Sequence, residues 1–508
     1  MGSSLRVFVN TGAQYLKALI SLVISLYTAR IVLANLGVDD FGIYNVVGVV
    51  VSMLSFFQGN LSRTSQRYLS YYQGKGDKKT VVKIFNNCVT TQLIIAVALC
   101  GILLLCTPLV FRFLLNIDPS RLDTAKIVYL LAVGMLFFNL LSTPYLAALI
   151  SRENIVYSSI IQIFDAFLKI PIAISLIYIS GDKLTWYSIM TFSVCVLNTL
   201  CYYAYCRLKY YECKEFSFKS FDFAIFKDMF SFMGWNIYGT LCVTGRTQGI
   251  ALLLNNFFTV AINSAYGIAN QLMSQLSFIS NALTIAMNPR IIKSEGAGDR
   301  QKMLRLTEIS CKFSFLLLSI IIIPAVLHMD TILEIWLKNV PDYTSMFCKF
   351  ILISALADQL TVNLAAANHA VGNVKQFNLR LYTIKIITLP VAYVLLKLHM
   401  PVYYVMIDYL VFEIICATAR VVFIHQTIGL SIRGYLKNVL VSVVPSLLAN
   451  IAVCLVVFRY FGGWWCLLTF VVSALITVVA TILFGLKEDE KVILKSLVSE
   501  IRRKAVSK

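Results

Sequence analysis

The sequence predicts an all-α integral membrane protein with about 14 membrane-spanning helices. First, 59% of its 508 residues are hydrophobic and only 14% are charged, a balance that a soluble domain could not keep without aggregating. Second, the apolar residues gather in stretches of about 20, the length of helix that crosses a bilayer. Third, two stretches about 220 residues apart repeat each other, as in transporters built from two related bundles.

Each predicted span is an apolar stretch between short polar connections. In chain order the spans are 10–34, 42–71, 84–109, 124–149, 155–179, 184–206, 225–253, 259–288, 306–328, 345–369, 377–397, 402–425, 438–459 and 464–485. The first is a span and not a cleaved signal, because its apolar stretch continues past Ile31 with no small-residue cleavage pattern behind it. The connections are short, so no soluble domain is expected between the spans.

The repeat has the same order of motifs in both copies. Gly42-Ile43-Tyr44-Asn45, Leu54-Ser55-Phe56 and Gly74-Lys75-Gly76-Asp77 return as Gly267-Ile268-Ala269-Asn270, Leu276-Ser277-Phe278 and Gly296-Ala297-Gly298-Asp299. Each copy is a span that leads into a Gly-Asp turn followed by Lys or Arg. We therefore expect two pseudo-symmetric lobes of six helices in the same orientation. The predicted parts are an N-lobe over 1–215, a C-lobe over 216–430, spans 13 and 14 over 431–486 and a basic tail over 487–508.

The distribution of Lys and Arg between alternate connections orients the chain. One side holds most of them, beginning with Arg6 and the turn over 75–83. The other side carries Arg112, Arg121, Lys183, Lys338, Lys397 and Arg459. By the positive-inside rule the basic side is cytoplasmic, so both termini are predicted to be cytoplasmic. Membrane orientation thus explains the net charge of +19, and we expect no nucleic-acid partner.

The cysteine and histidine patterns suggest no catalytic chemistry. Thirteen Cys are scattered singly, without a CxxC pair or a His at metal-ligand spacing, as is typical of small apolar packing residues. We expect neither a metal nor another cofactor. The four His form no nucleophile–base constellation, and the connections are too short for catalytic loops. An enzyme such as a polysaccharide polymerase or ligase is therefore disfavoured.

Ionisable residues inside spans indicate a cavity or a buried pair, because a charge at the bilayer centre costs about 2.5–3.5 kcal/mol. The cations predicted to bind substrate in a cavity are Lys17, Arg30, Arg63, Lys169 and Arg246. The acids that are candidates for ion coupling are Asp165, Asp358 and Glu413. Alternatives stay open: Arg30 can sit at the outer interface beside Asp39 and Asp40, and each acid can form a structural buried pair. Asp165 and Lys169, four residues apart, can neutralise each other.

The first spans of both halves carry polar faces. Span 1 places its polar residues three or four apart on one stripe: Asn10, Thr11, Gln14, Lys17, Ser21, Ser25 and Thr28. Span 7 has Ser231, Asn236, Thr240, Thr244, Arg246 and Gln248, interrupted by Gly234, Gly239, Gly245 and Gly249. These glycines either let the helix bend or let another helix pack closely. The two basic, polar faces predict the walls of a cleft for an anionic cargo.

The N-terminal motifs resemble those of a known family. Arg30-Ile31-Val32-Leu33-Ala34-Asn35-Leu36-Gly37, Asp40-Phe41-Gly42-Ile43-Tyr44, Arg67-Tyr68-Leu69-Ser70 and Gly74-Lys75-Gly76-Asp77 are similar to the N-terminal signature of Wzx-type polysaccharide flippases. Their superfamily also holds the multidrug and toxic-compound exporters (MATE) and the lipid II flippases. The resemblance implies two V-shaped, MATE-like lobes with two extra C-terminal helices, and a cationic cavity lined by the helices that carry Lys17, Arg30 and Arg246.

The resemblance also implies a function in the bacterial inner membrane. Such a protein moves an undecaprenyl-diphosphate-linked oligosaccharide from the cytoplasmic to the periplasmic leaflet by alternating access, for lipopolysaccharide O-antigen, capsule or another surface polysaccharide. Its expected partners are this glycolipid and membrane lipids, with a polymerase and glycosyltransferases as neighbours in the pathway. The alternative is a cation-coupled multidrug exporter of the same superfamily. Exporters typically have twelve spans and an acidic, aromatic-lined pocket, so the basic stripes and spans 13 and 14 count against it.

Overall fold

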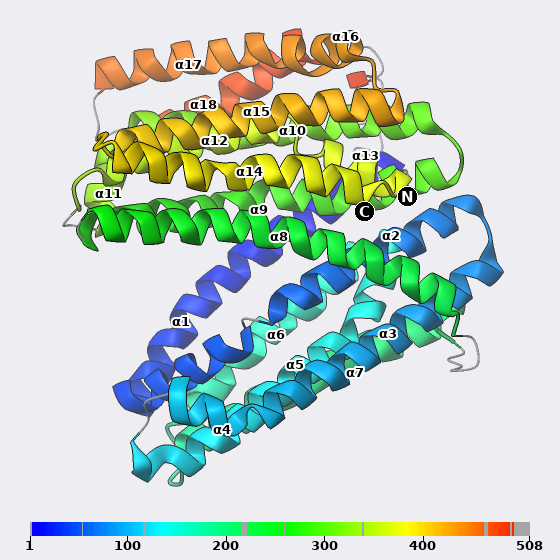
Figure 1. The fold of residues 1–508 in the computed structure, drawn as a ribbon, viewed down its shortest axis with the longest axis vertical. Helices are drawn as coiled ribbons and strands as arrows, with labels where there is room; N and C mark the ends of the chain where they lie inside the picture. The colour runs from blue at the N-terminus through cyan, green and yellow to red at the C-terminus, as the bar shows by residue number, and fades with distance from the viewer. Residues whose placement is uncertain are drawn as a thin grey trace, which may run out of the picture. The chain divides into compact units, whose positions relative to one another are not determined.

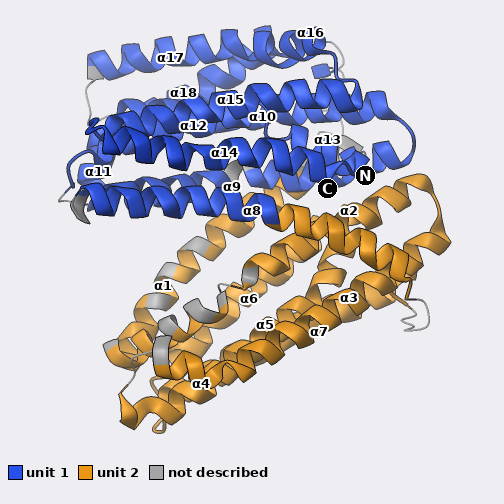
Figure 2. Ribbon diagram, in the orientation of Figure 1, with its two compact units in different colours: residues 1–7, 238–508 blue, residues 8–237 orange. Residues whose placement is uncertain are grey.

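The computed structural model describes residues 3–52, 54–114, 118–214, 221–258, 260–337, 340–461, 466–487 and 490–491. These residues form helices joined by short turns, and no strand occurs among them (Figure 1). They divide into two compact units (Figure 2): the N-unit, residues 8–237, and the C-unit, residues 1–7 and 238–508. The predicted all-α fold is thus confirmed, while most of the basic tail over 487–508 lies outside the described residues.

The boundary between the two compact units lies inside a helix, between Ile237 and Tyr238. Helix α8 (Phe223–Phe257) begins in the N-unit, where Asp228 accepts a 2.5 Å hydrogen bond from the Tyr68 hydroxyl. The Tyr68 ring also packs edge-on against Phe232, with 5.9 Å between centroids. These contacts tie the first turns of α8 to the N-terminal helices. Spans 13 and 14 belong to the same compact unit as the helices that precede them.

The N-unit is a bundle in which α5 packs along α2, α3 and α7. Its elements are α1 (Ser3–Ser52), α2 (Ser55–Lys75), α3 (Lys78–Leu105), α4 (Thr107–Leu109), η1 (Val110–Leu114), η2 (Pro119–Arg121), α5 (Leu122–Ser151), α6 (Ile155–Ser175), α7 (Lys183–Lys209) and η3 (Tyr211–Cys213). In the core, the buried Tyr129 side chain donates a hydrogen bond from its hydroxyl to the Leu103 carbonyl at 2.9 Å, so its one polar group is paired.

The C-unit packs α9 against α10, α12 against α15, and α17 against α18 (Figure 1). After α8 its elements are α9 (Val260–Gly296), α10 (Arg300–Leu327), α11 (Met329–Leu337), α12 (Thr344–Gln359), α13 (Leu364–Val371), α14 (Val374–Lys397), α15 (Tyr403–Ile428), α16 (Ile432–Tyr435), η5 (Leu436–Leu440), α17 (Val441–Phe461), α18 (Cys466–Ala480) and η7 (Thr481–Gly485). A core of buried Ile, Leu, Met and Phe side chains joins α8, α9, α10, α11, α12, α14 and α15.

The glycines of span 7 serve close packing. A Cβ added at Gly249 would lie 2.5 Å from the Leu389 side chain, and one at Gly239 would lie 2.7 Å from the Tyr382 ring. Gly245 similarly faces Ile386 at 3.2 Å. Glycine thus lets α8 approach α14 within the C-unit, which favours the packing explanation over the bending one at these three positions.

Among the described residues the fourteen predicted spans are largely helical, although 42–71 covers the end of α1 and most of α2 and not a single helix. Within the described residues nine helices are long and apolar enough to cross a membrane, or ten if the bent pair α12 and α13 counts as one. The predicted spans 42–71, 225–253, 259–288 and 402–425 are helical but do not meet this test. Arg246 of the predicted span 225–253 and Asp408, Glu413 and Arg420 of the predicted span 402–425 belong to the sites described below.

Glycines with positive φ interrupt or end helices at several described positions, among them Gly37, Gly76 and Gly298. Gly37 has φ 82° and ψ 173°, a conformation almost restricted to glycine, and it interrupts α1. Gly76 and Gly298 have φ of 77° and 80° in the two repeated turns. After each, the aspartate caps the next helix: Asp77 accepts from the Thr80 amide at 3.1 Å, and Asp299 from the Lys302 amide at 3.0 Å. The repeat read from the sequence thus has the same local geometry in both copies.

Candidate functional site

A polar cavity of about 710 Å³ lies within the N-unit. Helices α1, α2, α5, α6 and α7 line it. Its polar lining residues are Lys17, Ser21, Ser25, Thr28, Tyr44, Gln58, Asn139, Ser142, Gln162, Asp165, Lys169, Tyr187, Thr191, Asn198, Thr199 and Tyr202. Hydroxyl and amide groups of this density inside an apolar bundle are expected where a polar ligand or water is bound, because burying them unpaired costs free energy.

The stripe on α1 supplies one wall of this cavity. Lys17, Ser21, Ser25 and Thr28 all line it, as their spacing of three or four residues predicts. The Thr28 hydroxyl is bonded to the Ile24 carbonyl at 2.8 Å, so it presents its methyl group and remaining acceptor capacity. The Lys17 ammonium lies 3.5 Å from the Gln14 side-chain oxygen, and it is partly exposed. Lys17 therefore places a cation at the cavity on α1, the helix for which the sequence predicts a polar stripe.

Helix α6 supplies an ion pair on the cavity wall. The Lys169 ammonium lies 2.8 Å from one oxygen of Asp165, and the Asn198 side-chain amide donates to the other oxygen at 2.7 Å. The predicted pairing of these two residues along the helix is therefore present. Because Lys17, Lys169 and Asp165 all line the cavity, its ionisable side chains carry a net positive charge.

The remaining predicted cations of the N-unit lie elsewhere. Arg30 on α1 and Arg63 on α2 are exposed, and neither is among the described residues that line the cavity. Asp40, which the sequence placed beside Arg30, instead pairs with Arg121 at 2.5 Å. The Arg121 guanidinium also reaches Asp182 at 3.3 Å, so this cluster ties α1, η2 and the start of α7 together. The structure thus brings together Lys17, Lys169 and Asp165 but not Arg30 or Arg63.

The C-unit contains a chain of alternating buried charges. Arg246 of α8 pairs with Glu413 of α15 at 2.7 Å, and Glu413 also pairs with Lys385 of α14 at 2.9 Å. Lys385 reaches Asp358 of α12 at 3.3 Å, and Asp358 pairs with Arg420 of α15 at 3.1 Å. Three cations and two acids therefore form one connected network, which is the structural pairing that the sequence left open for Asp358 and Glu413.

Arg246 is both paired and incompletely bonded. Its guanidinium lies over the Tyr409 ring, 4.1 Å from the centroid, and donates to the Tyr409 hydroxyl at 2.9 Å. The residue is only 2% exposed, and its Nε and Nη1 atoms have no hydrogen-bond partner among the described residues. One oxygen of the buried Asp408 is in the same condition. Buried groups of this kind are candidate positions for a bound water or ion.

Several members of the network were not anticipated as site residues. Arg420 follows Glu413 by seven residues, two turns of helix, so their shared face could have been recognised from spacing. Tyr409 likewise precedes Glu413 by four residues, one turn of the same helix, whereas Thr361 had no such signal. The Arg420 guanidinium donates to the Thr361 hydroxyl at 2.8 Å, a contact between segments 59 residues apart in the sequence. Only the folded chain reveals contacts of this range.

Comparison with known proteins places the fold. No family model matches the sequence, and no curated protein matches it. Solved structures do match. The crystal structure of a MATE transporter in its straight conformation has a TM-score of 0.72 at 11% identity, with 84% of this chain and 97% of that chain covered. A MATE transporter of Vibrio cholerae gives a TM-score of 0.72 at 14% identity, covering 84% and 97%.

A third match carries a description of its binding pocket. It is a transporter of the MOP superfamily from Pyrococcus furiosus, described as having a binding pocket of reverse polarity that suggests a different function. Its TM-score is 0.68 at 10% identity, covering 84% of this chain and 98% of that chain. At such identities the likeness concerns the fold alone. The chain therefore has a MATE-like membrane transporter fold.

Proposed function

We propose that this protein is a flippase of the bacterial inner membrane, which moves an undecaprenyl-diphosphate-linked oligosaccharide from the cytoplasmic to the periplasmic leaflet by alternating access. The MATE-like fold supports membrane transport, and the N-terminal motifs resemble those of Wzx-type flippases. The observation that carries the choice of cargo is the polar cavity of the N-unit with its net positive lining. The glycolipid delivered to the periplasmic leaflet would serve surface polysaccharide synthesis.

The lining chemistry suits this cargo. A diphosphate and several sugars cannot cross hydrocarbon unaided, whereas the polyprenyl chain can remain in the lipid. The ammonium groups of Lys17 and Lys169 can donate charge-assisted hydrogen bonds to phosphate oxygens. The Ser, Thr, Asn and Gln side chains of the lining can exchange hydrogen bonds with sugar hydroxyls. A volume of about 710 Å³ lies in the range of ligand sites, so it suits part of a glycolipid headgroup and not the whole lipid.

Ion coupling would use acids that are already paired. Asp165 lies in the same cavity as the proposed cargo, whereas Asp358 and Glu413 belong to the buried network of the C-unit. Asp408 joins these candidates because one of its buried oxygens has no hydrogen-bond partner among the described residues. We assign the primary coupling role to Asp165, since a single cavity then holds both the cargo and the ion.

The proposal is tested by genetics and by cavity substitutions together. A deletion strain should accumulate lipid-linked repeat units that face the cytoplasm, and normal surface polysaccharide in that strain would remove the hypothesis. Restoring the gene with Lys17→Gln or Lys169→Gln should recover only a fraction of the polymer. Lys126→Gln is the matched control, because Lys126 is an exposed lysine of the same unit that pairs with Asp123 outside the cavity. Expression of each variant in the membrane must equal that of the parent.

The second candidate function is a cation-coupled multidrug exporter, and the solved structures of similar fold favour it in part because several are described as MATE transporters. The net positive lining of the N-unit cavity counts against it, since such a lining repels organic cations. Drug-resistance profiling of an overexpressing strain distinguishes the two. Genes for a polymerase and glycosyltransferases beside this one would favour the flippase.

A further inference from the structure

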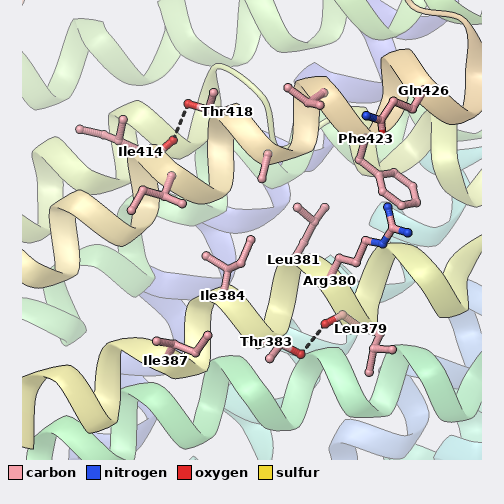
Figure 3. Close-up of a pocket in the computed structure, with 13 residues that line it drawn as sticks. Leu379, Arg380, Leu381, Thr383, Ile384, Ile387, Ile414, Thr418, Phe423 and Gln426 are labelled. Atoms are coloured by element: carbon pink, nitrogen blue, oxygen red, sulfur yellow. Dashed lines mark hydrogen bonds between the residues drawn. The ribbon is translucent and has the colours of Figure 1, made fainter.

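A long apolar groove lies between α14 and α15 on the C-unit, with a volume of about 890 Å³. Large aliphatic side chains line it, among them Ile415 and Val422. Leu379, Ile384, Ile387 and Ile414 belong to the same lining and are labelled in Figure 3. The hydroxyl of Thr418 is bonded to the Ile414 carbonyl at 2.9 Å, and that of Thr383 to the Leu379 carbonyl. The middle of the groove therefore presents almost only hydrocarbon.

One end of the groove is polar, because the cation Arg380 lies there. Arg380 lines the groove and is exposed, and its guanidinium carbon lies 5.6 Å from the centroid of the Phe423 ring. Figure 3 shows Arg380 extending toward Phe423, with Gln426 on the next turn of α15. No acidic side chain in the described part of the chain forms an ion pair with Arg380. A guanidinium and an amide thus close the end of a hydrocarbon groove.

The dimensions of the groove match one leaflet of a bilayer. On α15 the lining runs from Ile414 to Gln426, which is about 18 Å at 1.5 Å per residue, close to half of a hydrocarbon core of about 30 Å. Arg380 comes six residues after the start of α14, about 9 Å along the helix. A charge at this depth needs an anion or must reach the headgroups, because hydrocarbon does not solvate it.

We propose that this groove binds one anionic phospholipid, with an acyl chain against the aliphatic side chains and the headgroup phosphate on Arg380 and Gln426. Basic positions between membrane helices are recognised sites for anionic headgroups, and arginine matches a phosphate with paired donors. The polar end lies where α14 begins, beside Lys375, which the positive-inside rule places on the cytoplasmic side. The lipid therefore belongs to the cytoplasmic leaflet. This inference does not depend on the cargo proposed above.

Native mass spectrometry of the purified full-length protein tests the proposal, with equimolar phosphatidylglycerol and phosphatidylcholine offered as probes. The parent protein should retain phosphatidylglycerol in preference to phosphatidylcholine. Arg380→Gln should lower this retention about 5-fold, the effect of one basic contact worth about 1 kcal/mol. Arg380→Lys keeps the charge and should lose less. Lys397→Gln is the matched control, since Lys397 is an exposed cation at the other end of the same helix.

A second variant separates the groove from the charge. Ile415→Trp fills the groove at an exposed position and should reduce retention while leaving Arg380 in place, so it also serves if Arg380→Gln does not fold. Equal retention of the two lipids by the parent, or unchanged retention in both variants, would overturn the proposal. Preferential displacement of phosphatidylglycerol by equimolar undecaprenyl phosphate would overturn it too, and would assign the groove to a polyprenyl chain.

Discussion

Glu413 pairs with two cations of the C-unit network, Arg246 and Lys385. Removing the charge of Glu413 should therefore destabilise the protein more than removing the charge of Lys385, which lies between the two acids. Glu413→Gln keeps the size and hydrogen-bonding capacity of the side chain but removes the negative charge opposite Arg246 and Lys385. Of the two acids in the described ion-pair network, only Asp358 then remains opposite its three cations. Removing one partner of a buried pair leaves an uncompensated charge, and we expect a loss of about 3–5 kcal/mol in the free energy of unfolding.

Lys385→Met is the matched comparison, and the network explains why it should be mild. It leaves Arg246 with Glu413 at 2.7 Å and Arg420 with Asp358 at 3.1 Å, which are two neutral pairs. Because each acid keeps one cation, no buried charge is left uncompensated, so the expected change is within about 1 kcal/mol. The same reasoning predicts that Arg246→Met added to Glu413→Gln recovers part of the loss, by about 0.5–3 kcal/mol of coupling.

The assay is reversible unfolding in mixed micelles of increasing denaturing detergent, followed by the helical signal in circular dichroism. Parent, both single variants and the double variant are compared in the same lipid and detergent. Equal destabilisation by Glu413→Gln and Lys385→Met would refute the argument, because it would mean that the balance of charge in the network does not set its stability. A stabilising Glu413→Gln would refute it more strongly.

Three further predictions concern other positions. Gly76→Ala and Gly298→Ala each place a Cβ on left-handed backbone, at φ of 77° and 80°, so each should lower the free energy of unfolding by about 1–2 kcal/mol, and clearly unequal losses would contradict the equivalence of the two turns. Arg152→Met removes the bidentate partner of the buried Glu212 carboxylate and should lower the free energy of unfolding by about 3 kcal/mol. Arg152→Lys should lower it less. If thermal unfolding shows no effect of Arg152→Met, Glu212 has another counter-ion. Burial pulls the pKa of Asp182 upward, but hydrogen bonds from Thr185 and Thr124 and the Arg121 guanidinium outweigh it and hold that pKa below its usual value. The stability that ionised Asp182 contributes is therefore present above its unfolded pKa of about 3.9, and it is lost as the pH falls through the lower pKa of the folded state. Asp182→Asn should thus weaken the fall in the free energy of unfolding at acid pH. An unchanged dependence of that free energy on pH would contradict this prediction.

The sequence predicted those features whose causes are local. A helix of spanning length follows from an apolar stretch, and a polar stripe follows from spacing of three or four residues, so the wall formed by Lys17 and its neighbours could be anticipated. The turns at Gly76 and Gly298 were recognisable for the same reason, since a left-handed glycine and a capping aspartate act within a few residues. The Asp165–Lys169 pair is likewise a contact along one helix.

Partners from distant parts of the sequence could not be predicted. The pairing of Arg246 with Glu413 joins residues 167 apart, and nothing in either neighbourhood identifies the other. Lys312 on α10 is fully buried and pairs with Glu490, 178 residues away, where composition would suggest only a basic cytoplasmic tail. For Arg30 the sequence left a cavity position and an outer-interface position open, and the side chain is exposed and outside the described lining of the N-unit cavity.

The ion pair in the N-unit cavity sets a condition on how cargo and a coupling ion can share it. Asp165 has one oxygen on Lys169 and the other on Asn198, so a coupling cation would compete with the Lys169 ammonium for this carboxylate. The phosphate of the proposed cargo relieves this competition, since a more highly charged oxyanion attracts the Lys169 ammonium more strongly than one carboxylate does. Cargo binding then frees Asp165, and each ligand favours the other by the same factor. An exporter of organic cations needs the carboxylate available before its cargo arrives, and the closed Asp165–Lys169 pair therefore weighs against that function.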